Sequence, residues 1–322
     1  MNISRRDFLK YCAFFSASLG LSSLQIGRLG EVLANPTGPS VIWLNGASCS
    51  GCSISFLNTI NQSTDVGAVL IESINLVFHP ELMSVSGKLA IKAILDTFER
   101  GNFILVIEGG IPTAYEGKTC ILWSEPAIAE VSSNGSDDRN DIDGGNIREV
   151  TCEEAVKRLS SRAAHIIALG SCAVFGGVAA AGENPTAIKS VAKILDLDNL
   201  DRGKKVISLP GCPVHPDSLV STLVKILNNE TLEVDDFGRP KFIYGKSVHS
   251  VCPMLGKPRA TTYGSQDKCL IALGCSGPRA KSNCPTRKWN EGVNWCIGAG
   301  TPCIACVEEN FPAKSPLIKY NV

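Results

Sequence analysis

The sequence has no excess of charge of either sign and few aromatic side chains. Its 322 residues include 31 Lys and Arg against 31 Asp and Glu, and aromatic residues make up 6% of the chain. A nucleic-acid-binding protein needs a basic stripe or aromatic stacking platforms, so the composition does not favour that class of partner. With 44% hydrophobic and 19% charged residues, the chain can bury a substantial core, which excludes general disorder.

The first 34 residues have the pattern of an export signal. Ser4-Arg5-Arg6-Asp7-Phe8-Leu9-Lys10 is a twin-arginine motif, and a mildly apolar stretch leads from it to a small-residue cleavage site at Val32-Leu33-Ala34. A membrane anchor would need about 20 apolar residues, and this stretch is shorter and rich in Ser and Gly. We therefore expect Tat export of the folded protein to the periplasm. The mature chain should have no transmembrane segment, and a partner would have to provide any membrane association.

From residue 39 to about residue 244, apolar runs alternate with helix-like stretches. Buried strands are predicted at 41–44, 74–78, 103–107, 165–169 and 206–209, and helices at 81–100, 153–162 and 219–227. Thr151-x-x-Glu154 is a capping box that opens the second helix. Such alternation predicts a mostly parallel sheet covered on both faces, which binds ligands at the carboxyl ends of its strands.

Cysteines follow three of these predicted strands. Cys49 and Cys52 come after the first strand, Cys172 after the fourth and Cys212 after the fifth. The last 82 residues hold another seven of the 14 cysteines, among many Gly and Pro. A segment with so little core of its own needs disulfides or metal to hold it together.

Three kinds of chemistry are open to these cysteines. An exported protein favours disulfides, but Tat substrates fold in the cytoplasm, where thiols stay reduced. Zinc sites draw their ligands from a short stretch, whereas Cys49, Cys172 and Cys212 lie far apart in the sequence. Chelating CxxC spacings, and flanking Gly and Pro that let backbone amides approach sulfide, favour iron–sulfur clusters.

Motifs along the whole mature chain carry a family resemblance. In the N-terminal half they are Cys49-Ser-Gly-Cys52, Glu108-Gly-Gly-Ile-Pro112, Gly170-Ser-Cys172-Ala-Val-Phe-Gly-Gly177 and Pro210-Gly-Cys212-Pro-Val-His-Pro216. In the C-terminal half they are His249-Ser-Val-Cys252, Cys269-Leu270, Gly274-Cys275-Ser-Gly-Pro278, Cys284-Pro285, Trp289-Asn290, Trp295-Cys296 and Pro302-Cys303-Ile-Ala-Cys306. From about Val41 to the C-terminus, this order resembles the small subunit of nickel–iron hydrogenases, whose periplasmic members also carry a twin-arginine leader.

The resemblance implies twelve ligands for three 4Fe–4S clusters. The proximal cluster would be held by Cys49, Cys52, Cys172 and Cys212, the medial cluster by Cys284, Cys296, Cys303 and Cys306, and the distal cluster by His249, Cys252, Cys269 and Cys275. No catalytic residue is expected in this chain, because the nickel–iron centre belongs to a large partner subunit. Cys120 and Cys152 are left over as ordinary buried or helix-terminal thiols. His79, His165 and His215 are assigned only packing or hydrogen bonding.

Two positions refine the resemblance. Many family members have Pro at the position of Cys296, so that only three cysteines remain and their medial cluster is a 3Fe–4S cluster. In having a cysteine at this position, the chain resembles the nickel–iron–selenium branch of the family. Oxygen-tolerant relatives place additional cysteines at the positions of Gly51 and Gly177, so their special proximal cluster is not expected here.

The sequence therefore predicts an α/β protein in three parts. Residues 1–34 would be the twin-arginine signal peptide, 35–244 a flavodoxin-like parallel-sheet domain, and 245–322 a small irregular iron–sulfur domain. The implied function is electron relay between the hydrogen site of the large subunit and an external carrier, such as a multihaem cytochrome c. Two alternatives are a free-standing electron carrier and the related small subunits of deazaflavin-reducing hydrogenases or respiratory complexes.

Overall fold

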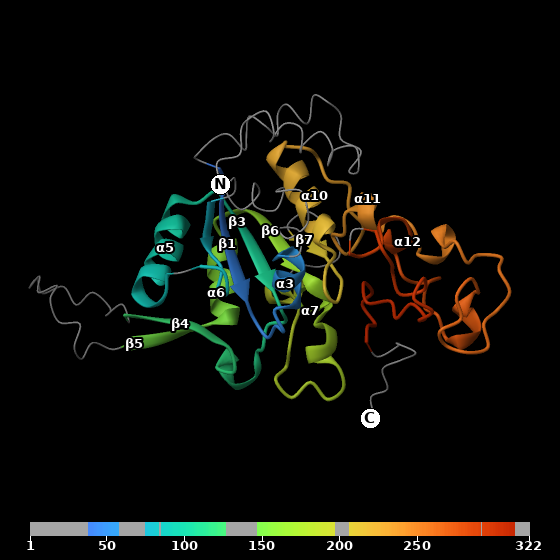
Figure 1. Ribbon diagram of the computed structural model, residues 1–322. Coiled ribbons are helices and arrows are strands. Elements are labelled where there is room, and N and C mark those ends of the chain that lie inside the picture. The colour runs from blue at the N-terminus through green and yellow to red at the C-terminus, as the bar shows by residue number, and fades with distance from the viewer. Residues whose placement is uncertain are drawn as a thin grey trace, which may run out of the picture.

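A five-stranded parallel sheet forms the centre of the molecule (Figure 1). Its strands are β1 (Ser40–Asn45), β2 (Asn75–Phe78), β3 (Phe103–Glu108), β6 (Ala163–Leu169) and β7 (Val206–Leu209). They lie in the order β2-β1-β3-β6-β7, and each neighbouring pair is parallel. Counted within the sheet alone, this is the 2-1-3-4-5 order of flavodoxin-like folds. The predicted α/β fold and its five strands are confirmed.

The computed structural model describes residues 38–57, 75–83, 85–126, 147–196, 206–290 and 292–312. The predicted signal peptide lies outside these ranges. The helices are α3 (Gly51–Leu57), α5 (Gly87–Arg100), α6 (Cys152–Ser160), α7 (Gly170–Phe175), α8 (Val191–Ile194), α10 (Pro216–Leu227), α11 (Lys241–Tyr244) and α12 (Cys284–Arg287), with 3-10 turns η1 (Ala114–Gly117), η2 (Gly177–Ala180), η3 (His249–Val251) and η4 (Leu270–Leu273). None of the described helices is long and apolar enough to span a membrane.

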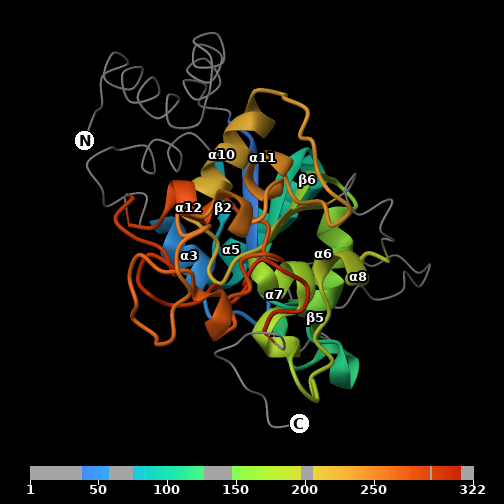
Figure 2. The same cartoon turned by 90° about the vertical axis from the view of Figure 1, so that its right-hand side faces the viewer.

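Apolar side chains alternate between the two faces of the sheet, and helices cover both faces (Figures 1 and 2). Ile42 and Leu44 of β1 point into the core beneath α5, α6 and α8. Val41 and Trp43, on the opposite face, belong to the core that includes α3 and α10. This period of two in a sheet buried on both sides explains why the strands are continuous apolar runs.

The C-terminal part packs on the same face as α3 and α10. Its buried apolar residues, among them Val248, Leu270 and Trp295, belong to one continuous core with the sheet. No strand of the sheet comes from the described residues after β7. The buried Arg239 joins the two parts, since its guanidinium contacts the Glu308 carboxylate at 3.1 Å and the Val307 carbonyl at 3.0 Å.

The structure differs from the predicted elements in two places. The helix predicted at 81–100 begins only at Gly87, because a turn precedes it in which the Met83 amide bonds the His79 carbonyl. A small antiparallel sheet of β4 (Ile121–Pro126) and β5 (Ile147–Thr151) was not predicted. The capping interaction is confirmed, since the Thr151 hydroxyl accepts the Glu154 amide at 3.2 Å at the start of α6.

Candidate iron–sulfur sites

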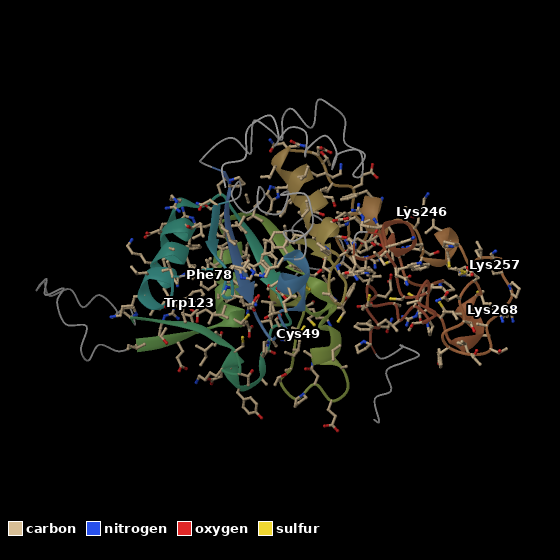
Figure 3. All side chains as sticks on the ribbon, viewed as in Figure 1. Cys49, Phe78, Trp123, Lys246, Lys257 and Lys268 are labelled. Atoms are coloured by element: carbon tan, nitrogen blue, oxygen red, sulfur yellow. The ribbon has the colours of Figure 1, made fainter. Side chains whose placement is uncertain are left out.

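Four cysteines meet at the carboxyl edge of the parallel sheet. Cys49 follows β1 and Cys52 lies in the first turn of α3, while Cys172 lies in α7 directly after β6 and Cys212 follows β7. Cys49 and Cys212 are exposed, whereas Cys52 and Cys172 are partly buried. Figure 3 labels Cys49 at this edge, on the side away from α5.

These four thiols lie near enough to influence one another electrostatically. Burial raises the pKa of Cys52, and the neighbouring Glu108, Cys172 and Cys212 raise it further. Burial, with smaller contributions from Cys172 and Cys49, raises the pKa of Cys212 to about 11. Four thiolates therefore cannot gather here as free anions, but they suit a cationic iron–sulfur core that neutralises them.

Glycines give this site the room that sulfur needs. A Cβ on Gly170 would lie 2.9 Å from the sulfur of Cys52, and one on Gly177 would lie 2.8 Å from the sulfur of Cys172. Both glycines also have positive φ angles, of 89° and 57°. A side chain at either position would displace a thiol and strain the backbone.

Glu108 fixes the loop that carries the first two cysteines. This side chain, 2% exposed at the end of β3, accepts the amide of Cys52 at 3.0 Å and that of Ser53 at 3.3 Å. The Trp43 indole and the Ser48 hydroxyl donate to the same carboxylate, each at 3.2 Å. Glu108 belongs to one of the motifs that carry the family resemblance, but its role could not be predicted, because its donors are distant in the sequence.

A second group of cysteines surrounds a cavity between the sheet domain and the C-terminal part. The cavity has a volume of about 490 Å³ and is lined by Cys284, Cys296, Cys303 and Cys306, with Cys212 from the first group. Burial raises the pKa of Cys303 to about 12, to which the nearby Cys275, Cys296 and Cys284 also contribute. The Ala305 amide donates to the sulfur of Cys303 at 3.4 Å, and the Ser282 hydroxyl lies 3.0 Å from that of Cys284.

The third group lies in the loops of the C-terminal part. Cys269 and Cys275 both lie near Cys252, because they raise the pKa of its thiol, although burial raises it most. The Met254 amide donates to the sulfur of Cys252 at 3.4 Å. Backbone hydrogen bonds hold His249 beside the loops that carry these cysteines. The His249 amide donates to the Gly277 carbonyl at 3.0 Å, and the His249 carbonyl accepts the Cys252 amide at 3.2 Å.

The three groups form a connected series. The amide of Cys303, in the second group, donates to the sulfur of Cys275, in the third, at 3.3 Å. Ser171, beside Cys172, donates its hydroxyl to the carbonyl of Cys306 and accepts the Gly211 amide at 3.0 Å. Backbone donors to sulfur and loop-to-loop bonds of this kind are typical of iron–sulfur sites.

No three His, Cys, Asp or Glu side chains within the described ranges converge on one ion position. The four ligands of a cubane bind different irons and lie farther apart than the ligands of a single ion.

The remaining cysteines and histidines lie in ordinary structural positions. Cys152 is buried at the start of α6, and its amide bonds the Cys120 carbonyl at 2.8 Å. The ring of His215 accepts the Asp217 amide at 3.2 Å at the start of α10 and lies 2.7 Å from the Lys288 carbonyl. His79 is fully buried against Ser53, with 3.3 Å between the ring nitrogen and the hydroxyl.

Two family models match adjacent parts of the chain. Residues 49–226 match the 20 kDa subunit of NADH ubiquinone oxidoreductase. Residues 244–318 match the C-terminal domain of the NiFe/NiFeSe hydrogenase small subunit. The first match alone would fit the respiratory alternative, but the second adds the domain that distinguishes hydrogenases.

Relatives over nearly the full length decide between these classes. The periplasmic [NiFeSe] hydrogenase small subunit of Desulfomicrobium baculatum is 37% identical, with 98% of both chains covered. The periplasmic [NiFe] hydrogenase small subunit of Solidesulfovibrio fructosivorans is 33% identical, covering 96% of this chain and 90% of the relative. A solved structure of the D. baculatum [NiFeSe] hydrogenase matches with a TM-score of 0.74 and 36% identity, covering 86% of this chain and 97% of that chain. This protein belongs to the family of nickel–iron and nickel–iron–selenium hydrogenase small subunits.

Proposed function

We propose that this chain relays electrons through three 4Fe–4S clusters, between a hydrogen-splitting large subunit and an external carrier. As a member of the small-subunit family, it is the electron-transfer partner in a heterodimeric hydrogenase. The observation that carries the proposal is the connected series of three cysteine groups, which runs from the sheet edge to the outer loops of the C-terminal part.

The ligand assignment and the division of the chain are parts of this proposal. Cys49, Cys52, Cys172 and Cys212 bind the proximal cluster in domain 35–244. Domain 245–322 binds the medial cluster through Cys284, Cys296, Cys303 and Cys306, and the distal cluster through His249, Cys252, Cys269 and Cys275. Residues 1–34 direct Tat export to the periplasm.

Bound iron–sulfur clusters supply one-electron oxidation and reduction at thiolate-ligated iron. The protein positions the sulfur ligands and sets their surroundings. Amide donors to the sulfurs of Cys252, Cys275 and Cys303 stabilise negative charge on them, which tends to raise the reduction potential. The neutral imidazole of His249, replacing a thiolate, would act in the same direction at the distal cluster.

The exposure of the first group supports a large partner. Cys49, whose sulfur adjoins Gly51, and Cys212 are both exposed in this chain alone. A free-standing carrier would leave its proximal cluster open to solvent, whereas a partner subunit would cover it. The proposal therefore favours the heterodimer over the free-standing electron carrier.

The test compares two activities in the co-expressed heterodimer. His249→Ala should slow hydrogen-dependent reduction of a dye far more than it slows hydrogen–deuterium exchange, because exchange needs only the large subunit. His249→Cys supplies a thiolate and should restore dye reduction, and Ser250→Ala, an exposed neighbour, is the matched control. Equal loss of both activities would assign His249 to folding or assembly. No loss of either would remove it from the relay.

A further inference from the structure

The two parts of the chain carry opposite net charge. Residues 35–244 include 17 Lys and Arg against 25 Asp and Glu, whereas residues 245–322 include ten against four. The whole chain is close to neutral because the excess of acidic residues in 35–244 offsets the excess of basic residues in 245–322. Such asymmetry creates a field that steers charged partners toward one side of a molecule.

Basic residues lie close in the sequence to the proposed distal ligands. Lys246 precedes His249 by three positions, Lys257 follows Cys252 by five, and Lys268 adjoins Cys269. Arg259 is held beside the same site, because its backbone forms a β-bridge with Cys269. Figure 3 shows the three labelled lysines along the outer edge of the C-terminal part, away from Cys49.

These charges are available to a partner. Lys246, Lys257, Arg259 and Lys268 are all exposed. Within the described part of the chain, no ion pair or side-chain hydrogen bond engages any of the four. Asp267 is the exposed acid among them. The side chains of Leu255 and Tyr263, 53% and 59% exposed, lie in the same stretch of sequence. Apolar anchors among charged residues are typical of protein–protein interfaces.

A redox protein explains this position better than a lipid surface does. The basic residues flank the ligands of the one cluster proposed to deliver electrons to the outside, and an electron acceptor must approach that cluster. A membrane surface would also attract lysines, but it has no need for them to surround a redox site. Lysines that served only to balance the cluster's charge would not have to be solvent-exposed, where water and salt screen them.

We propose that Lys246, Lys257, Arg259 and Lys268, with Leu255 and Tyr263, form a basic exit face that binds an electron carrier with an acidic surface. This inference rests on the proposed function, because it names the chemistry of the carrier that the relay serves. For each hydrogen molecule split in the large subunit, two protons are released and two electrons leave through this face. Two one-electron carriers are thereby reduced. A multihaem cytochrome fits only if its docking surface is acidic.

The experiment uses one haem protein in two charge states. Mitochondrial cytochrome c is basic, and its succinylated form carries carboxylates on its lysines around the same haem. Hydrogen-dependent reduction of each is measured with the heterodimer at about 0.01 M and about 0.1 M salt, between which the Debye length falls from about 30 to about 10 Å. Each rate of cytochrome reduction is divided by the rate of hydrogen–deuterium exchange that the same preparation shows.

The succinylated form should be reduced at least about tenfold faster at low salt, and salt should diminish this preference. Lys257→Glu/Lys268→Glu should abolish the preference. Lys88→Glu/Lys193→Glu, which makes the same charge change at exposed residues of α5 and α8, should preserve it. Equal reduction of both forms, or the same effect of both double variants, would overturn the inference.

Sedimentation with phosphatidylglycerol vesicles tests the lipid alternative. The carrier proposal would be overturned if the wild type bound the vesicles, Lys257→Glu/Lys268→Glu removed this binding, and the wild type showed no preference for succinylated cytochrome. These results together would assign the face to a membrane. A wild-type heterodimer with no exchange and no dye reduction would instead contradict the proposed function itself.

Discussion

The carboxylate of Glu108 accepts the backbone amide of Cys52 at 3.0 Å, although 56 positions separate the two residues. The same carboxylate also accepts the indole N–H of Trp43 and both the amide and the hydroxyl of Ser53. The loop that carries Cys49 and Cys52 is therefore anchored to the end of the central strand β3 by one buried side chain.

Glu108→Gln should loosen this loop. An amide nitrogen cannot accept hydrogen bonds, so donors now satisfied by one carboxylate oxygen would lose their partner, at a cost of about 1–3 kcal/mol. We expect a lower thermal midpoint and a proximal cluster that loses iron faster to a chelator. Glu99→Gln, an exposed change on α5, is the control. Equal iron release from both variants would contradict the anchoring role.

Cys120 and Cys152 should be dispensable for iron binding. The thiol of Cys152 donates to the sulfur of Cys120, which lowers the pKa of Cys120 and raises that of Cys152. Cys120 directly precedes β4, and Cys152 is the first residue of α6. The double Ser variant should keep all its iron, whereas Cys172→Ala should lose about four irons per chain. Iron analysis of both variants checks the assignment, which fails if the Ser variant loses a cluster.

Cys296→Pro should convert the medial cluster to a 3Fe–4S form in a protein that stays folded. Cys284, Cys303 and Cys306 would still line the cavity, and on the proposed assignment they should retain three irons. The medial potential should rise, because the cluster loses one iron and one ligand together. Electron paramagnetic resonance reports the new cluster type, with Cys120→Ser as a control. An unchanged spectrum would show that Cys296 is not a ligand.

His79 should make stability depend on pH below neutrality. Burial lowers its pKa from 6.5 to about 4, despite the opposing effect of Glu81. The unfolded chain therefore takes up a proton on this residue that the folded chain does not, as the pH falls from about 6.5 to about 4. The contribution of buried, neutral His79 to the free energy of unfolding is complete above about pH 6.5, and it decreases as the pH falls from about 6.5 to about 4. His79→Asn should flatten the decrease of the thermal midpoint, measured by circular dichroism. If the thermal midpoints of the wild type and the variant decrease in parallel with falling pH, His79 is not the source of the pH dependence.

The sequence predicted most of the central sheet and much less of what anchors the site. Continuous apolar runs such as 103–107 reveal strands buried on both faces, and the cysteines that follow them necessarily meet at one edge. The role of Glu108 was not predictable, because its donors lie 55 to 65 positions away. The strands β4 and β5 are half exposed and mix polar with apolar residues, so no clear apolar run marks them. The packing of Trp295 on the sheet core depends on tertiary contacts that no local pattern encodes.

The number and type of clusters on this chain test the central claim most directly. Iron and sulfide analysis of the purified heterodimer, corrected for the large-subunit iron, should give about twelve irons per small subunit. Electron paramagnetic resonance of the enzyme as isolated should show no 3Fe–4S signal. About eleven irons together with such a signal would contradict the assignment of four ligands to every cluster.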